Sequence, residues 1–217
     1  MTIYVTQKQY NLLKRMLPVM RAFYQNDIRP LFEEVAKQYG TTEEDVVKAA
    51  DIFYSVPVTA ACQKDVSELT TLIDEVKKAK NIHIESSDVL RKSPFVKTIH
   101  IPDDAKSTLI DALDTYSRVL MGQFFIIYEQ LDMNTQNPHV EEAWSDAKWG
   151  GINVREMRDV LIPELKCMEW NGSYGIAGKD NKYDSKLSYE MLKVIRKRRD
   201  DYILRVTDQP LLIVDEF

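Results

Sequence analysis

Residues 102–131 read PDDAKSTLIDALDTYSRVLMGQFFIIYEQL, and this stretch carries the strongest helical signal in the chain. Its apolar residues recur every three or four positions, which is the spacing of one buried face of an amphipathic helix. That stripe consists of Leu109, Leu113, Tyr116, Leu120, Phe124, Ile127 and Leu131. It predicts one long helix that ends at the loop of residues 134–138.

The same spacing predicts further helices over residues 10–24, 27–39, 42–53, 66–80, 140–148, 154–166 and 186–204. Pro18 should kink or restart the first of them, because proline lacks a backbone donor. Gly40 is suited to the left-handed conformation that follows a helix end. Thr42 with Asp45 is typical of a capped helix start.

Three short segments have the composition of strands instead. Alternation and β-branching favour strands at residues 81–85 (NIHIE) and 95–101 (FVKTIHI), and the apolar run at 211–214 favours a third. We therefore expect an α+β fold that is predominantly helical with a few short strands. The polar residues 86–94 form a soft boundary between an N-terminal helical region, 1–95, and a C-terminal region, 96–217, that carries the expected site.

One internal similarity crosses this boundary. Ile3-Tyr4-Val5 and the helix after it align at a fixed offset with Ile99-His100-Ile101 and the stripe that follows. A strand leading into a long helix would then occur twice. Any two amphipathic helices align in this way, however, so a duplication needs self-similarity beyond the helical period.

Composition narrows the class of protein. The chain has 217 residues, a formal net charge of -5, and no long apolar run of the roughly 20 residues that span a membrane. We expect no membrane partner and no long nucleic acid as partner, since no global positive field attracts them. The N-terminus lacks the features of an export signal, which favours a cytoplasmic location. A homo-oligomer is left open.

Most signatures of catalysis are absent from the sequence. It has no Gly-rich loop ending in Gly-Lys-Ser/Thr, and Gly150-Gly151 is too short for a dinucleotide fingerprint. The run Gly172-Ser173-Tyr174-Gly175 lacks the glycine two positions before serine that a nucleophile elbow requires. Cys62 and Cys167 stand alone, which excludes a disulfide scaffold, and we expect both in the core.

Histidines are also too few for an ordinary metal site, which needs several ligands. Only His83, His100 and His139 are present. His139 lies two residues before Glu141, as in zinc deaminases, but the accompanying Pro-Cys-x-x-Cys is missing. We expect no metal and no cofactor.

The positive signal is basic and aromatic. Lys193 and Arg196 to Arg199 cluster on one predicted helix with Tyr189, offering donors for phosphate and a ring for stacking. A solvated helix end, where cations favour the dipole, explains the cluster equally well. Arg196 differs, because it falls on a partly apolar face and would need a partner if buried.

Two other segments interrupt the apolar pattern. Arg118, Gly122 and Gln123 break the long stripe, and glycine inside a helix costs about 1 kcal/mol relative to alanine. Close helix packing or an approaching ligand would compensate. The run Trp170 to Ile176 combines glycines, hydroxyls and rings, which suits a loop that closes on a small molecule or an ordinary turn.

Three of these motifs, in order, resemble a family of small, generally uncharacterised phage and prophage proteins. They are Tyr116-Ser-Arg-Val-Leu-Met-Gly-Gln-Phe124, Ser173-Tyr-Gly-Ile176 and Tyr189-Glu-Met-Leu-Lys-Val-Ile-Arg196. The resemblance covers about residues 99–200. After Arg196 the family tends to continue into Trp-Asp and Pro-Glu-Gly-Gly, whereas this chain has Lys-Arg-Arg-Asp-Asp-Tyr.

Phage origin, as the resemblance implies it, favours an anti-defence role in the host cytoplasm. We expect a protein that sequesters a nucleotide-derived immune signal, ADP-ribose-like or cyclic, without catalysis. The expected ligand-binding residues are Arg118 and Arg196 for phosphate, Gln123, Asn171 and Ser173 for hydrogen bonds, and Tyr174, Phe124 and Tyr189 for stacking. The alternatives are a protein-binding inhibitor of a host defence enzyme and a nucleotide phosphodiesterase using His139.

Overall fold

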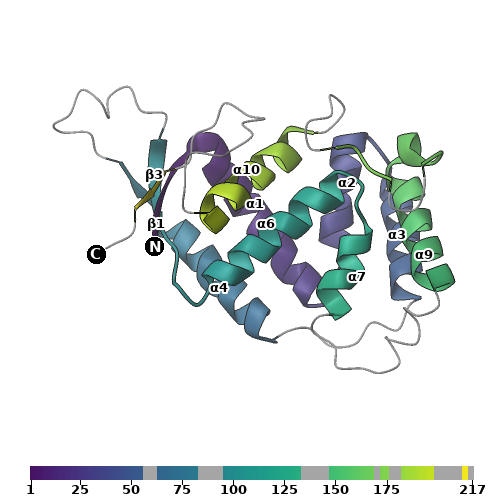
Figure 1. Cartoon of the computed structure of the whole chain (residues 1–217), viewed down its shortest axis with the longest axis horizontal. Coiled ribbons are helices and arrows are strands. Elements are labelled where there is room, and N and C mark those ends of the chain that lie inside the picture. The colour runs from purple at the N-terminus through teal and green to yellow at the C-terminus, as the bar shows by residue number, and fades with distance from the viewer. Residues whose placement is uncertain are drawn as a thin grey trace.

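The computed structural model describes residues 1–55, 63–82, 95–132, 147–168, 172–175, 182–197 and 212–214. Within these ranges the chain is predominantly helical, with a small antiparallel sheet at one end of the molecule (Figure 1). The predicted α+β, mainly helical class is confirmed.

Within the described ranges, the first half contains six elements. They are β1 (Thr2–Thr6), α1 (Gln7–Tyr24), α2 (Arg29–Tyr39), α3 (Glu43–Tyr54), α4 (Gln63–Lys77) and β2 (Lys80–Asn81). The predicted signals at the helix ends are confirmed: Gly40 follows α2 with a φ of 73°, and Thr42 and Asp45 form a reciprocal capping box at the start of α3. Contrary to expectation, α1 continues through Pro18 without a break.

The second half has a similar order of elements. They are β3 (Phe95–His100), α6 (Lys106–Leu120), α7 (Phe125–Asp132), α9 (Ala147–Leu161), the short 3-10 turn η1 (Pro163–Leu165), α10 (Tyr183–Lys197) and β4 (Leu212–Val214). The predicted last helix is confirmed as far as Lys197, its predicted residues 198–204 lie outside the described residues, and the predicted last strand is confirmed. The helix expected at 140–148 lies largely outside the described residues.

The predicted long helix is wrong in one respect, because it is divided at Gly122. This residue has a φ of 88°, which ends α6 and lets α7 begin three residues later. A side chain at this position would clash with Leu165 of η1. Helix termination and close packing together explain the glycine.

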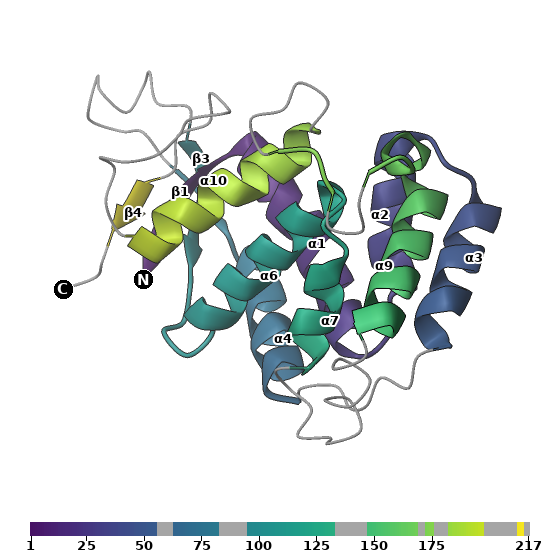
Figure 2. The ribbon, with the colours of Figure 1, turned by 45° about the vertical axis from the view of Figure 1, so that its right-hand side comes forward.

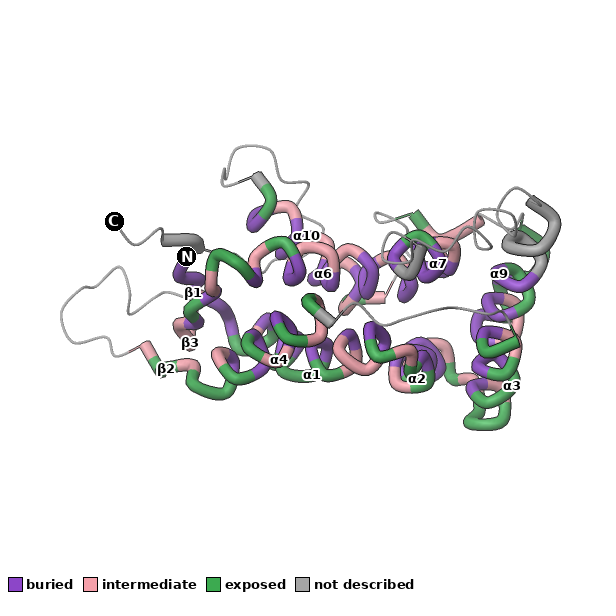
Figure 3. Tube along the Cα trace, turned by 90° about the horizontal axis from the view of Figure 1, so that it is seen from below, coloured by how far each residue is buried: buried purple, intermediate pink, exposed green. Residues whose placement is uncertain are grey.

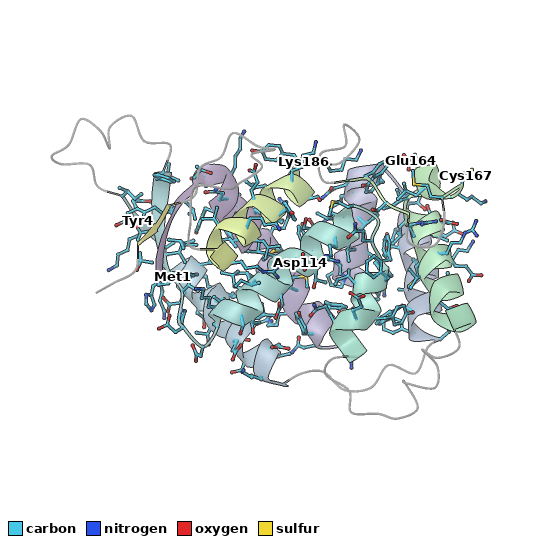
Figure 4. The ribbon with its side chains drawn as sticks, viewed as in Figure 1. Met1, Tyr4, Asp114, Glu164, Cys167 and Lys186 are labelled. Atoms are coloured by element: carbon cyan, nitrogen blue, oxygen red, sulfur yellow. The ribbon has the colours of Figure 1, made fainter. Side chains whose placement is uncertain are left out.

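The sheet joins the two halves of the chain. Its strand order is β2-β3-β1-β4, all antiparallel, and Ile3 pairs with Ile99 at its centre. Both isoleucines are almost completely buried. The amino group of Met1, labelled in Figure 4, adds a hydrogen bond of 3.0 Å to the carbonyl of Ile101.

The helices form two layers behind the sheet. Figure 3 shows α6, α7 and α10 on one side and α1, α2 and α4 on the other. Helices α3 and α9 pack together at the end away from the sheet, as Figures 1 and 2 show. One continuous apolar core contains side chains from both halves, so neither half buries its core alone. Cys167 is exposed, and its expected place in the core is wrong.

The two left-handed glycines provide a matched test of the packing at Gly122. Gly122→Ala should lower the free energy of unfolding by about 2–5 kcal/mol, combining left-handed strain with overpacking against Leu165. Gly40→Ala meets open space and should cost only the strain, about 1–2 kcal/mol. Urea denaturation of both variants measures the difference. Equal costs would show that Leu165 moves aside freely.

Candidate functional site

Three of the predicted ligand-binding residues meet where α6 turns into α7. The Gln123 side-chain amide donates a hydrogen bond of 3.1 Å to the Ser173 hydroxyl. The backbone N–H of Tyr174 donates to the carbonyl of Met121 at 3.0 Å. Residues about fifty positions apart in the chain are thus held together. Asn171, a fourth predicted residue, lies outside the described residues.

Two residues that the sequence analysis did not single out complete this group. The ring of Tyr39, at the end of α2, stacks parallel to Tyr174 with 6.0 Å between ring centroids. Lys182 places its ammonium group 4.8 Å from the centre of the Tyr39 ring. We call Tyr39, Gln123, Ser173, Tyr174 and Lys182 the tyrosine cluster, and all five are half-buried.

A buried arginine anchors the chain segment that leads into the tyrosine cluster. Arg158 of α9 is completely buried, and its guanidinium pairs with Asp159 at 2.8 Å. It also donates to the carbonyls of Gly172 and Met168, each at 3.1 Å. Arg158 therefore fixes the chain immediately before Ser173. The sequence contains no local signal for this role, because the accepting carbonyls lie ten and fourteen residues away.

Two predicted residues close to the turn have other partners. Phe124 is completely buried, and its ring packs against Phe32 with centroids 5.7 Å apart. The prediction that Phe124 stacks on a ligand is therefore corrected: its ring is part of the core. Arg118 is partly exposed and forms an ion pair of 3.1 Å with Asp114, one helical turn earlier.

The remaining predicted residues lie farther along α10. Tyr189 is half-buried beneath the ammonium group of Lys193, 4.9 Å from the ring centre. Arg196 is exposed, so it does not need the partner that a buried arginine would require. It lies thirteen residues after the start of α10, about 20 Å along the axis at 1.5 Å per residue. Arg196 and Lys182 therefore cannot hold the same small phosphate group.

A second polar group lies where four helices meet, on the same helix as Tyr39. Glu34 of α2 is almost buried and accepts from Arg15 at 2.9 Å, Lys37 at 2.9 Å and the Tyr116 hydroxyl at 3.0 Å. Arg15 also pairs with Asp184 of α10 at 2.5 Å. We call these five residues the Glu34 cluster. It connects α1 and α2 of the first half with α6 and α10 of the second.

Burial raises the pKa of two members of the Glu34 cluster. Desolvation, followed by the charge of Glu34, raises the pKa of Tyr116 far above its ordinary value, so the hydroxyl stays a neutral donor. Burial also raises the pKa of Asp184, although the charge of Arg15 opposes this shift. With three donors on Glu34, its carboxylate is already satisfied. The cluster is suited to joining helices rather than to transferring protons.

No family model, curated protein or solved structure matches the chain. Among the described residues, no group of three or more His, Cys, Asp or Glu side chains is arranged to hold a metal ion. No helix in the described ranges is long and apolar enough to cross a membrane. His139 lies outside the described residues.

Removing the buried guanidinium tests its role as an anchor. Arg158→Met should lower the free energy of unfolding by about 3 kcal/mol, because two carbonyls and the Asp159 carboxylate lose a charged donor. Arg155→Met is the matched control on the same helix. Its side chain is half-exposed and also pairs with Asp159, so the loss should stay below about 1 kcal/mol. Similar losses for both variants would contradict an anchoring role for Arg158.

A half-buried carboxyl on α6 gives a prediction for pH dependence. Burial and then the charge of Asp65 raise the pKa of Asp111, while Arg196 opposes the shift and Asp114 adds to it. The folded state therefore binds this proton more tightly than the unfolded state, and stability falls as pH rises through the carboxyl range. Asp111→Asn should be more stable than the parent at pH 7, by less than about 1 kcal/mol because the group is half-exposed.

This advantage should vanish below the ordinary carboxyl pKa of 3.8, where Asp111 is protonated in both states. Urea denaturation at pH 7 and pH 3 measures it. Asp114→Asn serves as the control, because it loses the ion pair with Arg118 and should gain nothing at pH 7. An Asp111→Asn variant that is less stable at pH 7 would show that the carboxylate makes a net favourable contact.

Proposed function

We propose that this protein binds a small, phosphate-bearing aromatic ligand at the tyrosine cluster and retains it without converting it. The observation that carries the proposal is the convergence of two parallel rings, an ammonium group and a hydroxyl–amide pair from four separate segments. Small-molecule sites usually combine aromatic surface with a small number of precisely positioned polar groups. A nucleotide-derived ligand has both chemical parts that such a site recognises.

Each residue of the cluster has a distinct proposed role. Tyr174 stacks on the base. The Lys182 ammonium group, which lies over the Tyr39 ring, binds the phosphate. Gln123 and Ser173 bond to each other, and their remaining donors and acceptors bind the polar edge of the base or a ribose hydroxyl. Lys182 thus takes the role first expected of Arg196, which lies too far along α10.

The motif resemblance supports a particular class of ligand. Gln123 and Ser173-Tyr174 belong to two of the three motifs that resemble the phage family. A phage protein that binds a nucleotide without converting it would serve to sequester an immune signal, ADP-ribose-like or cyclic. Sequestration in the host cytoplasm is therefore our proposed biological role.

A protein-binding inhibitor is the second candidate, and one surface favours it. Helix α3 exposes Val47 and Tyr54, with 39% and 48% of their surfaces accessible. Aromatic side chains such as Tyr54 are enriched in protein interfaces. Such an inhibitor would need no ligand at the tyrosine cluster.

Thermal unfolding with a panel of ADP-ribose-like and cyclic nucleotides separates these candidates. A ligand at 100 times its Kd stabilises the folded state by about 2.7 kcal/mol. We expect at least one nucleotide to raise the Tm, and mass spectrometry of the heat-released ligand to recover it unchanged. A cleaved product would indicate a phosphodiesterase, and no stabilisation by any nucleotide would favour the protein-binding inhibitor.

Point variants then test the location of the site. Tyr174→Leu and Lys182→Gln should each abolish the nucleotide-dependent rise in Tm while leaving the Tm of the free protein within a few degrees, because both side chains are half-exposed. Tyr183→Leu is the matched control, since this exposed tyrosine adjoins Lys182 but contacts Lys8 instead. Binding that survives in Tyr174→Leu and Lys182→Gln but not in Tyr183→Leu would place the site elsewhere.

A further inference from the structure

Two turns of the chain are built identically, 96 residues apart. The described residues with positive φ are Asn26, Gly40 and Gly122, and Gly122 follows Asn26 by that interval. The backbone bonds of the first turn run from Gln25 N to Arg21 O and Ala22 O, from Asn26 N to Phe23 O, and from Asp27 N to Ala22 O. Those of the second run from Met121 N to Ser117 O and Arg118 O, from Gly122 N to Val119 O, and from Gln123 N to Arg118 O. Every donor and acceptor is displaced by 96 residues.

The central strand pair has the same interval. Ile3 of β1 pairs with Ile99 of β3, and the strands run antiparallel. A twofold axis through this pair therefore carries Thr2, Ile3 and Tyr4 onto the β3 residues 96 positions later, and the register shifts only between Val5 and Thr6. The same axis exchanges the outer strands, because β2 pairs with β3 and β4 pairs with β1. The sheet of order β2-β3-β1-β4 therefore consists of two strand pairs, β2-β3 and β4-β1, that the axis exchanges.

A buried polar contact also occurs twice across this axis. The Tyr116 hydroxyl of α6 donates to Glu34 of α2 at 3.0 Å, and the Tyr24 hydroxyl of α1 donates to Gln130 of α7 at 3.1 Å. The acceptors Glu34 and Gln130 are again 96 residues apart. The tyrosines differ by one helical turn from that interval. The shared helical period does not impose a left-handed residue, a strand register or a buried acceptor.

We infer that the chain consists of two copies of one strand–helix–strand unit, β1 to β2 and β3 to β4, related by a pseudo-twofold axis between β1 and β3. Helix α4 packs on α1 as α10 packs on α6, and α3 packs on α9 across the axis (Figure 2). Each unit covers its apolar faces with the other, which explains the single shared core.

The two units differ in the length of the connection between α3 and α4 and of the corresponding connection between α9 and α10. In the first unit, residues 55–62 connect α3 to α4, whereas in the second, residues 162–182 connect α9 to α10. This longer connection supplies Ser173, Tyr174 and Lys182. It also supplies the two carbonyls that Arg158 binds. Insertions in one member of a repeat are common places for a binding surface.

A second part of the inference rests on the proposed function. The longer connection in the second unit, residues 162–182, is the extension that makes the tyrosine cluster a ligand site. The duplicated units supply only Tyr39 and the Gln123 turn, whose counterpart in the first unit is Asp27. The fold should therefore survive without the extension, and binding should not. The test keeps η1 (Pro163–Leu165), because Leu165 packs against Gly122.

The test replaces residues 167–181 of the full chain with four glycines. We expect circular dichroism to show unchanged helicity and a cooperative thermal transition, while the Tm rise caused by the nucleotide that stabilises the parent is lost. Because Arg158 would lose two carbonyl partners, a second variant combines the replacement with Arg158→Met. The second variant should be the more stable of the two.

The outcomes distinguish the two proposals. If no nucleotide stabilises the parent, ligand binding fails, yet cooperative folding of the shortened chain still supports a dispensable extension on duplicated units. If both shortened variants lose cooperative unfolding, the extension is part of the core and the inference is overturned. If a shortened variant folds and binds the nucleotide with the parent's affinity, the extension is not the site and the inference is again overturned.

Discussion

The antiparallel pairing of β1 with β3 is the constraint on which the rest of the structure depends. It is a contact between residues nearly a hundred positions apart, with Ile3 opposite Ile99 and both side chains buried. A shift of one strand by one residue would turn its isoleucine away from the core and break the pair. Each strand leads directly or after a short turn into a long helix, so this register also sets the relation of α1 to α6.

The polar contacts between the two helical layers follow from that arrangement. The Glu34 cluster forms where α1 and α2 meet α6 and α10, and it satisfies charges that would be costly if buried alone. Ser117 and Ser185 exchange hydrogen bonds of 3.0 Å between α6 and α10, which holds these helices close. The start of α10 is thereby fixed beside α2, and Lys182 reaches the ring of Tyr39.

Local chemistry in the sequence predicts much of the fold and little of the site. Gly40 and the Thr42–Asp45 capping box mark helix ends through contacts within four residues, and both were predicted correctly. The division at Gly122 was missed, because the apolar spacing continues through the turn and the reason for the glycine is Leu165, far along the chain.

The site shows the same limit. Gln123, Ser173 and Tyr174 were singled out by composition and do lie together, but Phe124 is a core residue despite its aromatic ring. No local sequence pattern predicts the contacts that Tyr39, Arg158 and Lys182 make. The repeated turn could have been aligned from sequence, although Asn26 and Gly122 share only their tolerance of a left-handed backbone.

Nuclear Overhauser contacts across the central strands test the paired arrangement most directly. In the chain of residues 1–217 we expect cross-strand contacts from Thr2 to His100 and from Tyr4 to Thr98, symmetric about the Ile3–Ile99 pair. Contacts displaced by one residue, or no contacts between these strands, would contradict the register and with it the pseudo-twofold relation of the two units.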